Sequence, residues 1–321
     1  MKTKNAILKT ALVLALTGLI FSGCRKNNSF DESSAADELS QQITNGSDES
    51  RFSAASDNVL DESNNVALDN SRFRGAGFHG IWLLSHTPCN ATIDSSQASI
   101  GKLTVTFNGT SCDGERTRTG QIVLQLPYNG TSVTPFSEAG CMLTITFNDF
   151  KISRLNENKT LTFNGTKYVT NVNGGLVDDA SEISTPIVHH ITGLVQITFD
   201  DGTVRTWNID RNRSITRLNN VTTVTITGNA TENGYSQVSI WGISRKGDSF
   251  TVTINTPVVL SSGCDYNAMS GVRMLHHVIR ELTATYGVDQ NGNAVTSGCP
   301  YGFKLNWMDK QGNAMQKVIA Y

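Results

Sequence analysis

The stretch that decides the fold is ITGLVQITFDDGTVRTWNIDRNRSITR, residues 191–217. Apolar residues alternate with polar ones over 195–199, which is the pattern of a strand that buries one face. The tripeptide Asp-Asp-Gly at 200–202 predicts a tight turn, because glycine readily adopts the positive φ that such turns require. Residues 203–216 alternate again, so the stretch predicts two antiparallel strands joined by a hairpin.

The same pattern recurs elsewhere in the chain. It is found at LTVTFNGT (103–110), LTITFND (143–149), LTFNGT (161–166) and VQITFDDGT (195–203). Its irregular spacing indicates neither a propeller nor a solenoid. Residues 272–286 fit a helical face or a strand face, and their β-prone end favours strands. We therefore predict an all-β protein, either a large antiparallel β-sandwich or two packed antiparallel β units.

The composition limits the classes of partner. The chain has 321 residues, a net charge of -2 and 17% charged residues. This balance gives no general attraction to nucleic acid, so we expect no nucleic-acid partner.

A polar break over 175–186 separates a β unit at 71–180 from one at 181–321, with one continuous domain over 71–321 as the alternative.

The N-terminus has the pattern of an export signal. Lys2 and Lys4 precede an apolar run over 6–20, which is too short to span a bilayer and is typical of a signal peptide. The run ends in Phe-Ser-Gly-Cys at 21–24, which resembles a bacterial lipobox with Phe21 in place of the usual aliphatic residue. That resemblance implies cleavage of a signal peptide of residues 1–23. The alternative is an ordinary secretory signal with an incidental cysteine.

Lipidation of Cys24 would follow, with palmitate-type acyl chains that hold the protein in a membrane. We therefore expect a lipid-anchored protein of the bacterial cell envelope, at the outer membrane.

Residues 24–70 are rich in Asp, Glu, Asn and Ser and poor in apolar side chains. This composition predicts a flexible acidic tether.

The order of strand segments between residues 95 and 310 resembles that of a known protein family. The segments LTVTFNGTSCDGERTRTGQIVLQL, MLTITFNDF, VQITFDDGTVRTWNIDRNRSIT and LTATYGVDQNGNAVTSGCPYGFKLNW resemble uncharacterised β-rich lipoproteins of Bacteroidota. The resemblance covers residues 95–310, and its most specific parts are Cys-x-Gly-x-Arg-x-Arg at 112–118 and DGTVRTWN at 201–208. It implies an all-β, envelope-anchored protein, and it implies no activity and no catalytic residue.

Five cysteines remain besides Cys24, and an exported protein meets an oxidising compartment. Two disulfides are predicted, because each pair of cysteines flanks a strand hairpin: Cys89 with Cys112, and Cys264 with Cys299. Cys141 would then be a buried strand residue. The sequence has no Cys-x-x-Cys spacing, which is the pattern typical of a zinc site.

The histidine pairs at 189–190 and 276–277 invite a metal hypothesis. Neighbouring side chains of a strand point to opposite faces, so one pair cannot easily bind one ion. A site built from two strands is the alternative. We predict no metal and no other cofactor.

Arginines flank a tryptophan at one parity of the 203–217 strand. Arg205, Trp207 and Arg211 are therefore candidates for a basic-aromatic groove that binds an anionic glycan. The competing interpretation is a structural ladder in which Trp207 covers Val195 and Ile197. A three-residue Asp-Asp-Gly loop would place Trp207 on the apolar face, whereas a two-residue loop would place it on the other.

Catalytic motifs are absent from the sequence: it has no Gly-x-Ser-x-Gly, P-loop, His-Glu-x-x-His or dinucleotide fingerprint. The favoured hypothesis is a lipid-anchored envelope protein with a non-catalytic structural, adhesive or binding role, whose partner is a glycan or an envelope protein. The alternative is a carbohydrate-binding surface lipoprotein that uses exposed aromatics, with Trp207, Trp241, Trp307 and Tyr301 as candidates. An envelope hydrolase is the third hypothesis.

Overall fold

A computed structural model of the chain describes residues 88–112, 114, 116–154, 159–177, 182–277, 281–309 and 311–321. The expected signal peptide, Cys24 and the acidic tether at 24–70 lie outside these residues. The chain divides into two compact units, Met1–Gln42 and Ile43–Tyr321, and every described residue belongs to the second.

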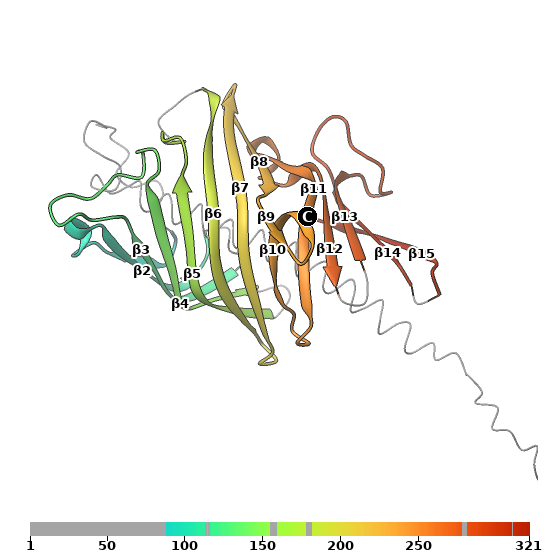
Figure 1. Cartoon of the computed structure of the whole chain (residues 1–321), viewed down its shortest axis with the longest axis horizontal. Coiled ribbons are helices and arrows are strands. Elements are labelled where there is room, and N and C mark those ends of the chain that lie inside the picture. The colour runs from blue at the N-terminus through green and yellow to red at the C-terminus, as the bar shows by residue number, and fades with distance from the viewer. Residues whose placement is uncertain are drawn as a thin grey trace, which may run out of the picture. The chain divides into compact units, whose positions relative to one another are not determined.

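The described residues form strands almost throughout (Figure 1). The first seven strands are β1 (Ala91–Asp94), β2 (Lys102–Thr110), β3 (Arg116–Gln125), β4 (Met142–Arg154), β5 (Lys159–Asn171), β6 (Ile183–Phe199) and β7 (Val204–Leu218). The others are β8 (Val221–Gly228), β9 (Ala230–Glu232), β10 (Tyr235–Ile243), β11 (Ser249–Ser261), β12 (Ala268–His277), β13 (Glu281–Val288), β14 (Gly302–Met308) and β15 (Ala314–Ala320). Two single 3-10 turns are η1 (Ala98–Ile100) and η2 (Ser262–Cys264). The predicted all-β class is confirmed, and the described part of 272–286, residues 272–277 and 281–286, lies in strands.

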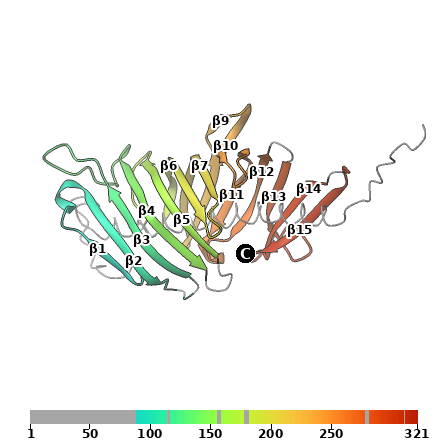
Figure 2. The same cartoon turned by 90° about the horizontal axis from the view of Figure 1, so that it is seen from below.

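All fifteen strands belong to one antiparallel sheet. Strands β1 to β7 pair in chain order, and so do β11 to β15. Between the two series, β8 pairs with β7 at Arg211–Leu218 and with β11, while β10 pairs with β7 at Asn208 and Ile209 and also with β11. Strands β8 and β10 therefore share the space between β7 and β11, and Figure 2 shows the β9–β10 hairpin standing out from its neighbours. Strands β5 and β6 flank the predicted polar break and pair along their length, so one sheet carries both predicted β units.

The Asp-Asp-Gly hairpin has the three-residue form. The N–H of Phe199 donates to the carbonyl oxygen of Thr203 at 2.9 Å, and the N–H of Gly202 donates back to Phe199 at 3.0 Å. Gly202 has a φ of 77°. This register places Val195 opposite Trp207. Of the two loops considered from sequence, the three-residue loop forms, and Trp207 lies on the apolar face.

From β2 to β8, one face of the sheet is buried and the other is accessible. In β7 the residues from Arg205 to Ile215 alternate between buried and half-buried positions. The buried side chains line up across strands in rows. One such row runs through Val105, Ile122, Phe147, Gly165, Val195 and Trp207. We call the face that carries this row the buried face and the opposite one the open face.

Two glycines make room at the centre of the buried face. Gly165 has a φ of 130° and Gly193 a φ of 144°, and a Cβ at these positions would lie 2.4 Å and 2.3 Å from backbone oxygens of the adjacent strand. Lys167 lies directly across from Gly193. Its ammonium is 5.7 Å from the ring centroid of Phe147 and 5.3 Å from that of Trp207. The missing side chains thus leave space for a lysine between two aromatic rings.

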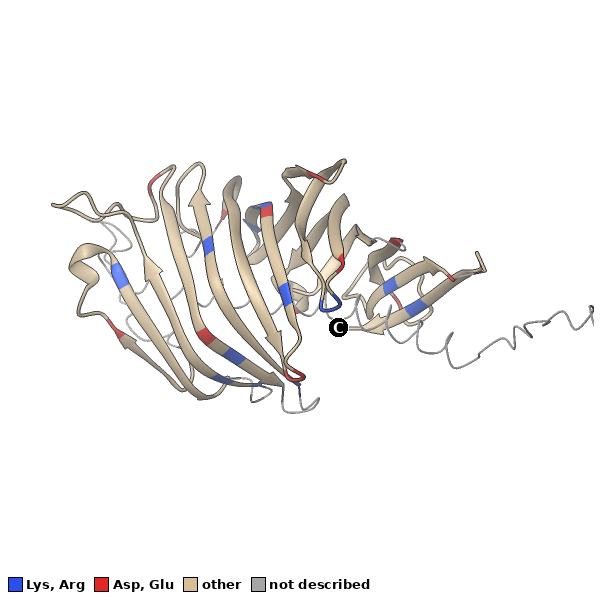
Figure 3. Ribbon diagram, turned by 60° about the horizontal axis from the view of Figure 1, so that its bottom comes forward, with Lys and Arg blue, Asp and Glu red and all other residues tan. Residues whose placement is uncertain are grey.

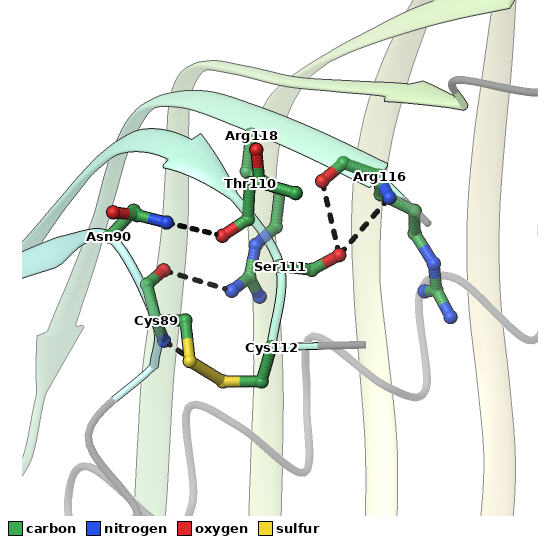
Figure 4. The surroundings of a disulfide bond; sticks show 7 residues. All are labelled: Cys89, Asn90, Thr110, Ser111, Cys112, Arg116 and Arg118. Atoms are coloured by element: carbon green, nitrogen blue, oxygen red, sulfur yellow. Dashed lines mark hydrogen bonds between the residues drawn. A yellow bond between two sulfur atoms is a disulfide. The ribbon is translucent and has the colours of Figure 1, made fainter. Parts of the chain in front are cut away.

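Both predicted disulfides are present, Cys89–Cys112 and Cys264–Cys299. The first joins the residues before β1 to the loop between β2 and β3 (Figure 4). Next to it, Arg118 Nη2 donates to the carbonyl oxygen of Cys89 at 3.3 Å. Arg118 is the last residue of the Cys-x-Gly-x-Arg-x-Arg stretch, so that motif holds a disulfide and an arginine together.

Cys141 lies directly before β4 and is a free, buried thiol. Burial raises the pKa of this thiol to about 11, and the nearby Glu138 adds to the effect. A thiol that stays protonated at neutral pH is a poor nucleophile and a poor metal ligand. Cys141 therefore serves the core as a small apolar residue.

Candidate functional site

Six cations point into the buried face: Arg118, Lys167, Arg205, Arg211, Arg213 and Arg273. Their exposed fractions lie between 0% and 8%. Taking a cation out of water costs several kcal/mol unless opposite charge or hydrogen bonds compensate. None of the six is free, since each has a further interaction in the folded chain. We call this set the buried cations.

Several of the buried cations lie over aromatic rings. The guanidinium carbon of Arg118 is 4.8 Å from the ring centroid of Phe107, and that of Arg205 is 4.0 Å from Phe250. Lys167 lies between two rings, as described above. A desolvated cation over a ring gains about 2 kcal/mol, which is less than the desolvation cost. Ring contacts alone do not explain why these charges are tolerated.

His189 on β6 lies opposite Arg213 in the same face. Its ring centroid is 5.3 Å from that of Phe136. Burial lowers the pKa of His189 to about 3, and the positive charge of Arg213 acts in the same direction. The imidazole is therefore neutral at physiological pH and adds no charge to the buried cations.

The ligand candidates named from sequence do not come together. Trp207 and Arg211 are fully buried, and Arg205 and Trp307 are nearly so. A ligand in solvent does not reach these four side chains in this conformation. Trp241 is half-buried on β10, and Tyr301, before β14, is 51% exposed. The aromatic surface expected from these residues is therefore not assembled on one accessible face.

The open face is rich in hydroxyl groups. Half-buried threonines that face outward from β2 to β8 include Thr104, Thr106, Thr144, Thr146, Thr162, Thr166, Thr192, Thr198, Thr206, Thr223 and Thr225. Some contact each other across strands, as Thr146 and Thr166 do with hydroxyl oxygens 3.4 Å apart. Figure 3 shows that charged residues are sparse along the strands. This face therefore offers many hydroxyls and little net charge.

A group of hydrogen-bonded polar side chains interrupts the threonines, and we call it the open-face cluster: His190, Asp210, Asn212 and Asn229. His190 Nε2 is 2.7 Å from Asp210 Oδ1, and Asn229 Nδ2 donates to the same oxygen at 3.0 Å. Asn212 Nδ2 donates to Asn229 Oδ1 at 3.2 Å. The side chains of His190 and Asp210 are 33% and 23% exposed. The cluster thus presents a carboxylate, an imidazole and amides in fixed orientations at the surface.

Tyr168 lies beside the open-face cluster. Thr192 on β6 is opposite Tyr168 on β5 at one edge and opposite Asp210 on β7 at the other. The tyrosine and the carboxylate are thus two strand spacings apart, about 10 Å. Tyr168 is 37% exposed, so its ring is available to a ligand that also reaches Asp210.

A second hydrogen-bonded chain joins Thr253, His276 and Glu281. His276 Nε2 lies 3.1 Å from Thr253 Oγ1, and its Nδ1 lies 2.9 Å from Glu281 Oε1. This order of groups is also that of nucleophilic triads. However, Thr253 is 4% exposed, its hydroxyl donates to Asn255, and the Tyr235 ring stacks on His276 at 3.8 Å. We interpret these contacts as structural, because they provide hydrogen-bond partners for both ring nitrogens of the buried His276.

The histidine pairs behave as strand geometry predicts. His189 packs in the buried face, whereas His190 belongs to the open-face cluster. Within the described ranges, no group of three His, Cys, Asp or Glu side chains could hold a metal ion. In the same part of the chain, no helix has the length and hydropathy to cross a membrane.

Comparison with protein-family models, curated proteins and solved structures found no match to this chain. Function must therefore be argued from the site itself. Sequence reasoning missed Tyr168 and Asp210, although their parity carried a signal. Tyr168 alternates with Lys167 and Val169, and Asp210 lies between two residues of the arginine face. In the structure, the alternation that puts Trp207 on the buried face puts Tyr168 and Asp210 on the open face.

Proposed function

We propose that the protein is a lipid-anchored, non-catalytic envelope protein that binds a neutral glycan on the open face of its sheet. The observation that carries this proposal is the exposed Tyr168 next to the open-face cluster. Around it, the sheet presents threonine hydroxyls rather than charges. The envelope location rests on the lipobox-like pattern ending at Cys24, and two disulfides are consistent with an oxidising compartment.

The chemistry of the cluster suits sugar hydroxyls, which both donate and accept hydrogen bonds. Asp210 accepts, while the amides of Asn212 and Asn229 can do both. Because these groups already bond to each other, they lose little side-chain entropy when a ligand arrives. The face of a tyrosine ring supplies apolar area against the C–H groups of a pyranose, and its hydroxyl can stay in water.

The test is a binding screen with the purified full chain against neutral and acidic envelope polysaccharides, by affinity electrophoresis and then calorimetry. We expect binding to a neutral polysaccharide that weakens at least tenfold in Tyr168→Ala and in Asp210→Asn, equivalent to about 1.4 kcal/mol. Tyr301→Ala is the matched control, because it removes an exposed tyrosine elsewhere. Failure to bind any polysaccharide, or equal loss in the control, would rule out this site.

A second experiment tests the location. Protease is added to intact cells and to lysed cells, and cleavage within the β domain is followed. Digestion on intact cells supports capture of an external glycan. Protection until lysis would assign the domain to the periplasm and redirect the search to peptidoglycan and other periplasmic polymers.

A further inference from the structure

The open face carries apolar side chains besides Tyr168. Leu194 on β6 is 52% exposed, although most apolar side chains of this strand are buried. Trp241 on β10 is half-buried and lies opposite Asn208 on β7, which in turn lies opposite Leu194. Directly opposite residues of an antiparallel pair point to the same face, so Trp241 and Leu194 both belong to the open face.

These two side chains lie one row away from the proposed glycan site. Leu194 comes two positions after Thr192 in β6, so it is the next residue on the same face. Thr192 is opposite Tyr168, and the diagonal from Tyr168 to Leu194 is about 7–8 Å. Tyr168 and Trp241 are three strand spacings and one row apart, which is about 16 Å. We call Tyr168, Leu194 and Trp241 the apolar series.

Hydrogen-bonding groups lie between the members of the apolar series. Thr192 and Asp210 share the row of Tyr168, and Asn208 lies beside Trp241. Asn208 Nδ2 donates to the carbonyl oxygen of Trp241 at 3.3 Å, which fixes the orientation of the amide. In these two rows of the described sheet, from β5 to β10, Asp210 is the one charged side chain. Apolar contacts separated by polar groups suit a chain of sugars, whose rings have C–H groups on their faces and hydroxyls at their edges.

The β9–β10 hairpin ends the accessible surface next to Trp241. Trp241 is opposite Thr251 on β11, and Thr251 is opposite His276 on β12. Asn233 Nδ2 donates to Thr251 Oγ1 at 2.9 Å, and the ring of Tyr235 stacks on that of His276 at 3.8 Å. The hairpin that stands out in Figure 2 therefore lies over the open face beyond β10, where Thr251 is only 3% exposed. On the other side of the series, the outward threonines of β4 are half-buried and remain accessible.

We propose that the open face binds a linear neutral polysaccharide in an extended form, so that successive sugars contact the members of the apolar series. The separation of about 16 Å exceeds the size of one pyranose ring, so no single sugar contacts both Tyr168 and Trp241. Because the hairpin ends the surface at Trp241, further sugars contact the protein on the β4 side. This inference rests on the proposed glycan function and adds the class of ligand, a polymer recognised along its length.

The length of the ligand provides the test. The purified full chain is titrated in a calorimeter with dextran, amylose, laminarin and mannan, with size-fractionated fragments of each, and with the corresponding disaccharides. For at least one polymer, we expect long fragments to bind at least tenfold more tightly than the disaccharide. Equal affinities for long fragments and the disaccharide would overturn the extended binding mode and leave the proposed glycan function intact. Failure of every probe to bind would count against the proposed function itself, and this inference would fall with it.

Variants of the apolar series separate its members. Trp241→Ala should weaken binding of the long fragments at least tenfold and leave disaccharide binding unchanged, whereas Tyr168→Ala should weaken both. Leu194→Ala should weaken binding of the long fragments at least threefold.

The matched control is Leu218→Ala, which removes another exposed leucine at the end of β7 and should change neither affinity. Wild-type affinity for long fragments in Trp241→Ala and Leu194→Ala would overturn the proposal. If urea unfolding shows that Trp241→Ala does not fold, the comparison of Leu194→Ala with Leu218→Ala decides, because both residues are exposed.

Discussion

Replacement of Gly193 by alanine tests how the centre of the buried face is built. The added Cβ would lie 2.3 Å from the carbonyl oxygen of Thr166 and 2.8 Å from the Cα of Lys167. Both are backbone atoms of the paired strand, so no side-chain rotation relieves the overlap. The φ of 144° adds strain of about 1–3 kcal/mol for a residue with a Cβ.

Relief requires that β5 and β6 separate locally, which weakens one or two ladder hydrogen bonds at about 1 kcal/mol each. It also moves Lys167 from its position by the Trp207 ring, a contact that contributes about 2 kcal/mol when buried. Together these costs amount to about 4–7 kcal/mol, and we expect Gly193→Ala to lower the free energy of unfolding by that amount. This is a large part of the 5–15 kcal/mol typical of a folded domain.

The assay is equilibrium unfolding in urea, followed by tryptophan emission. The matched control is Gly202→Ala in the Asp-Asp-Gly turn, where φ is 77° and no atom lies within 4 Å of the added Cβ. The control should lose only about 1–2 kcal/mol, the cost of a left-handed conformation. Equal losses in the two variants would refute the argument from strand approach.

Three further outcomes follow from the described residues. Replacing Cys264 and Cys299 by serine should lower the free energy of unfolding by about 4 kcal/mol, because the disulfide closes a loop with a sequence separation of 35. Unchanged urea curves would contradict this. Cys141 should react with a thiol reagent at pH 8 only after unfolding, since burial raises its pKa to about 11, and rapid labelling of the native protein would disprove it. Below pH 6.5 His189 binds a proton in the unfolded chain but not in the folded chain, where its pKa is about 3. The free energy of unfolding therefore decreases as the pH is lowered. Between pH 7.5 and 5.5 the wild type should lose about 1.4 kcal/mol more than His189→Asn in urea titrations, and equal losses would exclude this assignment.

Much of the sheet could be predicted from the sequence because its signals are local. Alternation identifies strands, and the Asp-Asp-Gly tripeptide joins two of them. The arrangement of β8 and β10 between β7 and β11 had no such signal, since it depends on pairings such as Ile209 with Ile240 between strands that are not consecutive. Whether strands stack as two sheets or extend one sheet is likewise not encoded by alternation, which only marks which side chains are buried.

The site was harder to predict than the fold. Alternation placed Arg205, Trp207 and Arg211 on one face, and the structure agrees that they share it. A face that carries both arginine and tryptophan is compatible with a ligand groove or with a buried layer. The sequence pattern does not distinguish the two, because burial depends on what packs against the face. Tyr168 and Asp210 come into one row only through Thr192, so their proximity requires the register of three strands.

The sharing of one gap by β8 and β10 has a consequence for the order of folding. Pairings between consecutive strands close short loops, which costs little conformational entropy and allows fast growth from any hairpin. Pairing of β7 with β10 and of β8 with β11 closes larger loops, and the backbone of β10 comes very close to those of both β7 and β8. A Cβ on Gly242 would lie 2.2 Å from the carbonyl oxygen of Thr206, and one on Gly228 would lie 1.9 Å from that of Gln237. We expect two hairpin arrays, one ending at β8 and one beginning with the β9–β10 hairpin, to form first and to join late. The kinetic boundary of this chain then lies between β8 and β10, far from the polar break near residue 180.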